Sequence, residues 1–237
     1  MSGTSTPKAD PKVSPRTPSR GRIDKRQAIL SAAFTVFAQR GYARACMEEI
    51  AEVAGVAKHT VYNHLGDKQN VFRSAMGAAA DDVMAQNLAV VDLFTAEGGA
   101  DASAEAPQDD VSARLEVLAH RLLERCCHEQ SWALRRLLYA EINQFPDLLE
   151  VVWGRGASRL KEALADRLAR LTLSGRLRPS DPAEASEHFL ALLTGPMEAR
   201  SQLGTRAVPE SEIHQVAHSA VRTFLLAYGA STPYLHT

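Results

Sequence analysis

Apolar residues recur every three or four positions along most of this chain, which is the spacing of an amphipathic α-helix. The clearest stripes are Ile29, Ala33, Val36 and Phe37; Val111, Leu115, Leu118, Leu122 and Cys126; Trp132, Leu134, Leu138 and Ile142; and Leu160, Leu164, Leu168 and Leu171. No segment alternates polar and apolar residues convincingly, as a half-buried strand would. The pattern therefore predicts an all-α fold of about nine helices.

Capping residues divide this pattern into elements. Ile23 followed by Asp24-x-x-Gln27 has the form of a hydrophobic staple with a capping box, which predicts that the first helix begins there. Gly41 supplies its left-handed C-cap. Asp67 is expected to cap a longer helix reaching towards Phe94. Asp181-Pro182 combines an N-cap with an N1 proline, which predicts another helix start.

Residues 47–65 predict a helix-turn-helix. Ala51 is small, as two closely crossing helices require, and Gly55 follows four residues later, where a tight turn needs positive φ. The positions expected to face inward are Ile50, Val53, Ala54, Val56, Val61 and Leu65. The outward face of the second helix carries Lys58, His59, Thr60, Tyr62 and Asn63, whose side chains suit base edges and phosphates. The alternative is an ordinary solvated helical hairpin.

The N-terminal segment also resembles the TetR family of bacterial transcriptional regulators. The matching residues are the run from Ala28 to Tyr42, then Met47, Ile50-Ala51, Ala54-Gly55-Val56, Thr60-Val61-Tyr62, His64, Lys68 and Val71-Phe72. Further along, Phe145-Pro146 and Asp181-Pro182 resemble the C-terminal domain of an AcrR-like subset. The resemblance implies a homodimer whose recognition helices enter the major groove of an operator, released by a small-molecule effector.

Carried over by position, the resemblance assigns contacts with double-stranded DNA. Lys58 and His59 are expected to contact base edges, and Asn63 is a further candidate. The residues expected to contact the DNA backbone are Thr60, Tyr62, His64 and Lys68. Departures from the family pattern are Ala45, Cys46, Ala57, Leu65 and Gln69. Because Ala45, Cys46 and Ala57 stand where the family has hydroxyl caps, Arg44 or a basic arm is expected to contribute more.

The distribution of charge along the chain supports a division into two parts. The net charge of −1 argues at first against nucleic acid as a partner, but residues 1–76 carry +6 and the remainder −7. Residues 1–22 are rich in Pro, Ser, Thr and Gly and predict a disordered basic arm. The expected domains are this arm, a DNA-binding domain at 23–73, and a ligand-binding and dimerisation domain at 74–230.

The C-terminal helices predict a small-molecule pocket and a subunit contact. Polar or aromatic residues on apolar helices are the candidates for the pocket, each with plain core packing as the alternative: His120, Trp132, Tyr139, Asn143, Trp153 and Phe189. The last two helices, about 182–203 and 210–228, are apolar on more than one side, which favours a four-helix dimer interface. The residues expected there are Phe189, Leu193, Met197, Ala217, Ala220 and Phe224.

The sequence gives weaker support for other classes of protein than for a DNA-binding regulator. No apolar run approaches a membrane span, and three cysteines favour a reducing, cytoplasmic location. His214 and His218 share a helical face but have no identifiable third ligand, so no metal or cofactor is predicted. Redox sensing by Cys126-Cys127 and an activator role stay open. An enzyme is disfavoured, since no nucleophile–base pair is apparent and Gly154-Arg155-Gly156 lacks a third glycine.

Overall fold

The computed structural model describes residues 20–94 and 111–230. Its helices are α1 (Arg20–Arg44), α2 (Met47–Val53), α3 (Lys58–Leu65), α4 (Lys68–Leu93), α5 (Val111–Cys127), α6 (Glu129–Glu141), the π-helix η1 (Glu150–Gly154), α7 (Arg155–Leu173), α8 (Pro182–Arg200) and α9 (Glu210–Tyr228). Apart from one bridge between Leu177 and Gly229, the described elements are all helical. The all-α prediction is confirmed.

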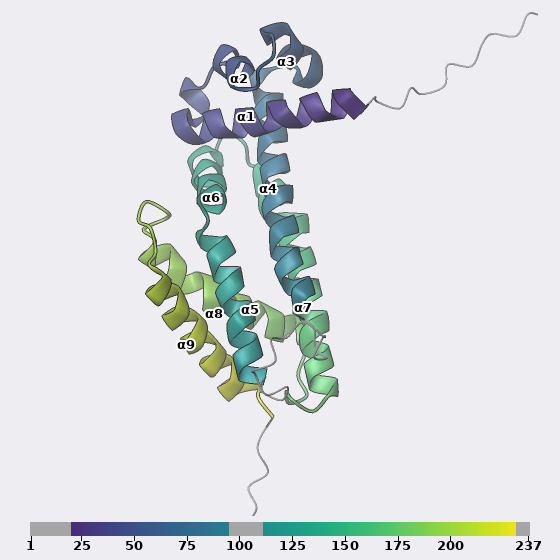
Figure 1. The fold of residues 1–237 in the computed structure, drawn as a ribbon, viewed down its shortest axis with the longest axis vertical. Helices are drawn as coiled ribbons and strands as arrows, with labels where there is room; N and C mark the ends of the chain where they lie inside the picture. Colours follow the sequence, from purple (N-terminus) through teal and green to yellow (C-terminus); the bar gives the residue numbers. More distant parts are fainter. Residues whose placement is uncertain (1–19, 95–110, 231–237) are drawn as a thin grey trace, which may run out of the picture.

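The molecule is elongated, with α1, α2 and α3 forming a head at one end (Figure 1). The long helix α4 starts in the head and continues into a body made by α5 and α7 to α9, while α6 lies directly under the head. One hydrophobic core joins α1 to α4 with α6, and a second joins the end of α4 to the body helices. The expected boundary between residues 73 and 74 therefore falls inside α4.

Most predicted helix boundaries agree with the structure. Asp67 caps α4 by accepting a hydrogen bond from the Asn70 amide at 2.9 Å, and Asp181 caps α8 in the same way. Gly41 interrupts α1 with a φ of +73°. The predicted start of α1 is wrong, because the helix begins at Arg20 and Asp24 lies inside it. Residues 1–19 of the predicted arm lie outside the described part of the chain.

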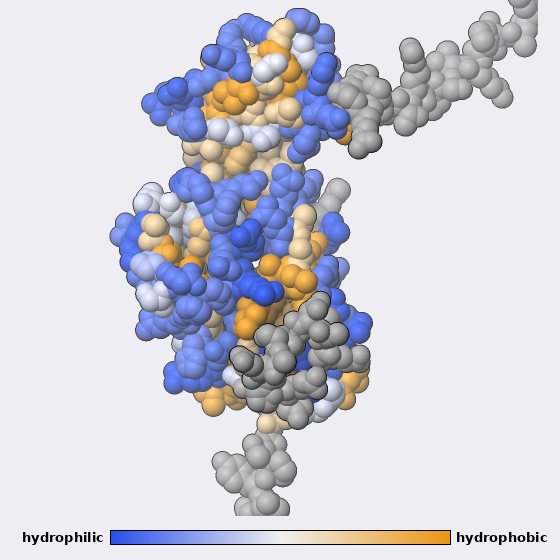
Figure 2. All heavy atoms as spheres, in the orientation of Figure 1, coloured by the Kyte–Doolittle hydropathy of each residue, from blue (hydrophilic) through white to orange (hydrophobic). Residues whose placement is uncertain are grey.

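The surface of the body is mainly hydrophilic, with hydrophobic residues gathered between α4 and α5 on the face shown (Figure 2). None of the described helices is long and apolar enough to cross a membrane.

The six residues predicted for the dimer interface are placed elsewhere by the structure. Phe189, Leu193, Met197, Ala217, Ala220 and Phe224 are all buried within the single chain. Phe189 and Phe224 pack edge to face at 5.1 Å in the second core. The assignment is corrected, because helical periodicity shows that a face is buried but not which chain buries it.

Candidate functional site

Helices α2 and α3 form the predicted helix-turn-helix. The turn is closed by a hydrogen bond from the Val56 amide to the Ala51 carbonyl at 3.0 Å, and Gly55 has a φ of +64°. Ile50 and Val61 are fully buried between the helices and the rest of the head. Val53 is 54 % exposed, against expectation, because it lies away from the face that Ile50 and Ala51 bury.

The outward face of α3 is polar and accessible at the far end of the head (Figure 1). Lys58, His59, Tyr62 and Asn63 are exposed, and Thr60 and His64 are half-buried. The side chains of Cys46 and Ala57 provide no capping hydrogen bond to α2 or α3, as the departures from the family pattern predicted. The described geometry therefore presents a short helix with a hydrogen-bonding face, suited to a DNA groove.

Lys58 has an acidic neighbour within the head. Its ammonium forms an ion pair with Glu48 of α2 and lies 5.8 Å from the centre of the Tyr62 ring. The hydrogen bond between the two groups lowers the pKa of Glu48 and raises that of Lys58. Lys58 is thus fully charged at neutral pH, and a phosphate or base acceptor has to compete with Glu48 for it.

Two other predicted DNA-contacting residues have partners inside the head. Lys68 donates a hydrogen bond to the carbonyl of Ala43 at 3.1 Å and lies 4.8 Å from the centre of the Tyr42 ring. Arg44 is exposed, and its Nε donates to the Arg40 carbonyl at 3.2 Å. These contacts give Lys68 a structural role at the α1–α4 junction, which sequence spacing alone did not show.

The body contains a cavity of about 340 Å³ between α4, α5, α6, η1, α7 and α8. Its apolar lining includes Met84, Leu122, Leu134, Trp153, Leu160 and Leu190. Arg135 and Lys161 also line it, and no described lining residue is acidic. The Oδ1 atom of Asn87 is buried at the cavity without a hydrogen-bond partner. Apolar walls with a few polar groups are what a small-molecule site requires.

Of the six residues predicted for the ligand pocket, only Trp153 is among those that line this cavity. His120 is paired with Glu210, and Trp132 is buried beneath the guanidinium of Arg135. Tyr139 and Asn143 are exposed, and Phe189 is in the second core. The prediction chose polar and aromatic residues by type, whereas the packing of the helices brings Asn87, Arg135 and Lys161 to the cavity.

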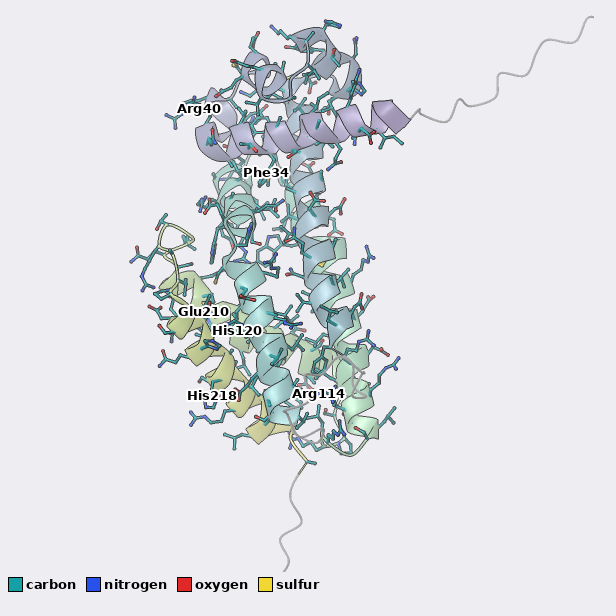
Figure 3. All side chains as sticks on the ribbon, viewed as in Figure 1. Phe34, Arg40, Arg114, His120, Glu210 and His218 are labelled. Carbon is teal, nitrogen blue, oxygen red and sulfur yellow. The ribbon has the colours of Figure 1, made fainter. Side chains whose placement is uncertain are left out.

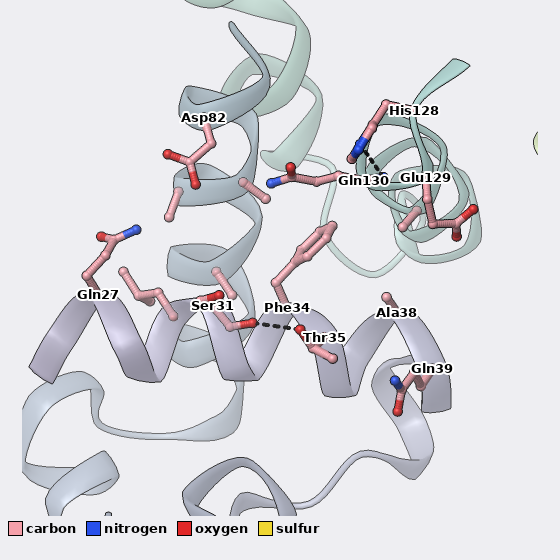
Figure 4. A pocket seen from close by; sticks show the side chains of 15 residues that line it. Gln27, Ser31, Phe34, Thr35, Ala38, Gln39, Asp82, His128, Glu129 and Gln130 are labelled. Carbon is pink, nitrogen blue, oxygen red and sulfur yellow. Dashed lines mark hydrogen bonds between the residues drawn. The ribbon is translucent and has the colours of Figure 1, made fainter. Parts of the chain in front are cut away.

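A second hollow, of about 470 Å³, lies between the head and the body (Figure 4). Helix α1 contributes Ser31 and Phe34, α4 contributes Asp82, and the start of α6 contributes His128 and Gln130. This lining is largely polar or small, so the head is loosely packed against α6 on this side.

On its other side the head is joined to α6 by an aromatic cluster. Phe145, after α6, packs against Tyr42 at 4.8 Å and against Phe72 at 5.1 Å between ring centres. Arg73 lies over the Phe145 ring and forms an ion pair with Asp147 at 2.7 Å. Since Arg135 of α6 lines the 340 Å³ cavity, α6 connects that cavity to the head.

The adjacent cysteines have surroundings that disfavour redox sensing. Cys126 is buried, and its sulfur accepts a hydrogen bond from Arg135 at 3.1 Å. Burial, helped by the neighbouring Cys126, raises the pKa of Cys127 to about 11. The reactive thiolate form of Cys127 is therefore scarce at neutral pH.

The helix-turn-helix head, its polar recognition face and the cavity-bearing helical body define a DNA-binding transcriptional regulator. Residues 29–75 match the family described as bacterial regulatory proteins, tetR family, and residues 113–230 match the AefR-like transcriptional repressor, C-terminal domain. The chain belongs to the TetR family. It is a ligand-responsive transcriptional repressor of that family.

Individual relatives agree with this assignment. The transcriptional repressor AcnR of Corynebacterium efficiens is 24% identical over 200 residues, covering 84% of this chain and 94% of that protein. The repressor BepR of Brucella suis is 43% identical over 56 residues, covering 24% of this chain and 27% of its own. A solved TetR-family regulator from Mesorhizobium loti is 29% identical, with a TM-score of 0.77, and covers 90% of this chain and 100% of its own.

Proposed function

We propose that the protein represses transcription by placing α3 of each subunit in the major groove of a pseudo-palindromic operator. The observation that carries this is the exposed face of Lys58, His59, Tyr62 and Asn63 on a helix-turn-helix head. Lys58, His59 and Asn63 contact base edges, while Thr60, Tyr62 and His64 contact the phosphate backbone. Arg44 adds a backbone contact from the end of α1.

The repressor acts as a cytoplasmic homodimer through exposed positions of α8 and α9. Ala191, Gly195 and Ala199 lie at i, i+4 and i+8 on α8 and are exposed. On α9, Thr223 and Leu226 are exposed, and Leu226 is 84 % accessible in the single chain. Small residues along one helix face allow two helices to approach closely, which a symmetric four-helix contact needs.

The effector binds in the 340 Å³ cavity and is an apolar molecule with an anionic group. The apolar walls bury its hydrocarbon part, and Arg135 and Lys161 pair with its charge. The unpartnered Asn87 Oδ1 accepts a hydrogen bond from an effector hydroxyl or amide. Because Arg135 belongs to α6, effector binding shifts the helix that supports the head, which lowers affinity for the operator.

The DNA interface is tested with duplexes selected by the full-length protein from a random pool, measured by fluorescence anisotropy. Tyr62→Ala should weaken binding to selected and scrambled duplexes alike, by about ten-fold, since a backbone contact is lost. Lys58→Ala should in addition relax base preference at one position, worth about 1–3 kcal/mol of discrimination. Arg170→Ala, the same loss of charge in the body, should change neither value. Equal binding of all duplexes by the unmodified protein would refute the proposal.

The cavity is tested by thermal shift with a panel of hydrophobic carboxylates and their uncharged amides. The carboxylates should stabilise the protein more, and Arg135→Leu should remove that preference. Ala157→Phe, which fills the cavity, should prevent release from DNA while leaving operator binding intact. Ala85→Phe adds the same ring at an exposed position of α4 and should respond normally. Undiminished release from Ala157→Phe would place the effector elsewhere.

A further inference from the structure

Helices α5 and α9 bring two histidines and a glutamate together, away from both cavities. Nε2 of His120 lies 2.6 Å from Oε1 of Glu210, the first residue of α9 (Figure 3). His214, one turn further along α9, has its Nε2 3.5 Å from the same oxygen. The two imidazole rings stack with their centres 4.2 Å apart, and each has its Nε2 within 3.5 Å of the same carboxylate oxygen.

We propose that His120, Glu210 and His214 bind a divalent transition-metal ion, with zinc as the representative. One ligand atom from each residue lies within 4.8 Å of the other two. Two imidazoles and one carboxylate are a donor set that zinc accepts, with water completing the tetrahedron. Bonds of about 2.0–2.1 Å in a tetrahedron separate ligand atoms by about 3.3 Å. To reach that spacing the 2.6 Å contact between His120 and Glu210 has to open and the stacked rings have to tilt, which the exposed side chains of Glu210 and His214 permit.

A neighbouring carboxylate lies near the far nitrogen of one of the ligands. Oε2 of Glu124, one turn along α5, lies 3.9 Å from Nδ1 of His120. A carboxylate on the far nitrogen of a ligating histidine favours the tautomer whose other nitrogen is free to bind metal. His120 is only 18 % exposed in its side chain, so its ring is already held in place before any ion arrives.

The geometry pairs His214 with His120 rather than with His218, the histidine that shares its helical face. Nδ1 of His218 lies 3.1 Å from Oε1 of Glu116, one turn of α5 away from His120. His214 instead completes a set drawn from two helices. An ion bound there would fasten the first turn of α9 to α5, which goes beyond the DNA-binding and effector-binding functions proposed above.

The test is isothermal titration of zinc chloride into full-length protein that has been freed of metal by a chelator. The unmodified protein should take up one zinc per chain at this site. His214→Asn and Glu210→Gln should each weaken that binding by about ten-fold or more, and Glu124→Gln by a smaller factor. His218→Asn is the matched control, an exposed histidine of the same helix, and should leave the affinity unchanged.

Two results would overturn the proposal: uptake no greater than that of a His120→Asn, His214→Asn double variant, or a loss on His218→Asn as large as on His214→Asn. His214 is 67 % exposed, so its replacement leaves the fold intact, and circular dichroism checks this. The double variant should still bind the operator without zinc. Failure of zinc binding is therefore distinguishable from failure of the DNA interface.

Discussion

Gly204, in the connection between α8 and α9, is a position where the identity of a single residue is fixed by two separate constraints. Its φ is +82°, and a Cβ added there would overlap the side chain of Trp132 on α6. Its carbonyl also accepts a hydrogen bond from Arg136 at 3.0 Å. The loop is thereby held against α6, the helix that connects the cavity to the head.

Gly204→Ala should destabilise the protein by about 3 kcal/mol or more, because the backbone strain and the overlap with Trp132 both have to be relieved. Gly175→Ala is the matched control, since Gly175 has a φ of +72° but open space around its Cβ, and should cost only about 1 kcal/mol. Urea unfolding at one protein concentration measures both. Equal losses would mean that Trp132 moves aside freely.

The role of Gly175 can be inferred from its place in the sequence and that of Gly204 cannot, for a physical reason. Gly175 ends an apolar stripe, so its role is local, whereas Gly204 depends on a tryptophan 72 residues earlier in the chain. The same distinction explains the candidate sites. The face of α3 follows from spacing within one helix, but Asn87, Arg135 and Lys161 meet only after separate helices have packed.

At the scale of elements, the link from α6 to the head rests on Phe145 and on the ion pair between Arg73 and Asp147. The hydrogen bond from Arg73 lowers the pKa of Asp147 below its ordinary value of 3.8. The pair therefore stabilises the folded state above about pH 4, and this stabilisation is lost as the pH falls through the lowered pKa.

Asp147→Asn should lower the stability at pH 7 by up to about 1 kcal/mol, a small value because both partners are partly exposed. The difference from the unmodified protein should shrink as the pH falls through the lowered pKa of Asp147, because Asp147 then becomes protonated in both states. Chemical unfolding across pH 2.5–7 gives the comparison. Asp166→Asn, in an exposed pair within α7, controls for the change of charge. Parallel curves for Asp147→Asn and the unmodified protein at every pH would contradict this account.

Periodicity predicted the helices well because each one buries a stripe. It did not predict η1, whose five residues have no buried member, nor the early start of α1, which begins at Arg20 and continues through Gly21 to Asp24. It also assigned Phe189 and Phe224 to a subunit contact, since a buried stripe does not reveal whether its partner is the same chain.

For the whole molecule, the opposing charges of the two parts have a measurable effect. The +6 of residues 1–76 should give operator binding a steep salt dependence, while the −7 of the remainder disfavours other approaches of DNA. The near-neutral total conceals this separation.

The chain cannot be cut cleanly between residues 1–76 and the remainder, however, because both contribute to one hydrophobic core. Phe72 and Met76 of α4 are fully buried in the same core as Leu138, Phe145 and Leu148, which come after residue 130. A fragment of residues 20–76 should therefore lack a stable fold, since it exposes the apolar surface that α6 covers. Circular dichroism of the fragment, beside the full-length chain, should show a non-cooperative thermal transition. A sharp transition would show instead that the head folds alone.

This shared core limits how such regulators can be recombined. A hybrid regulator that joins the head of one family member to the body of another has to be fused within α4, because this helix contributes to both hydrophobic cores. For this chain, the transplanted piece has to bring Phe145 and Asp147 with it, or supply matching residues, so that Tyr42, Phe72 and Arg73 keep their partners. Whether the head of one regulator fits the body of another is thus decided by a few residues just after α6 rather than by the recognition helix.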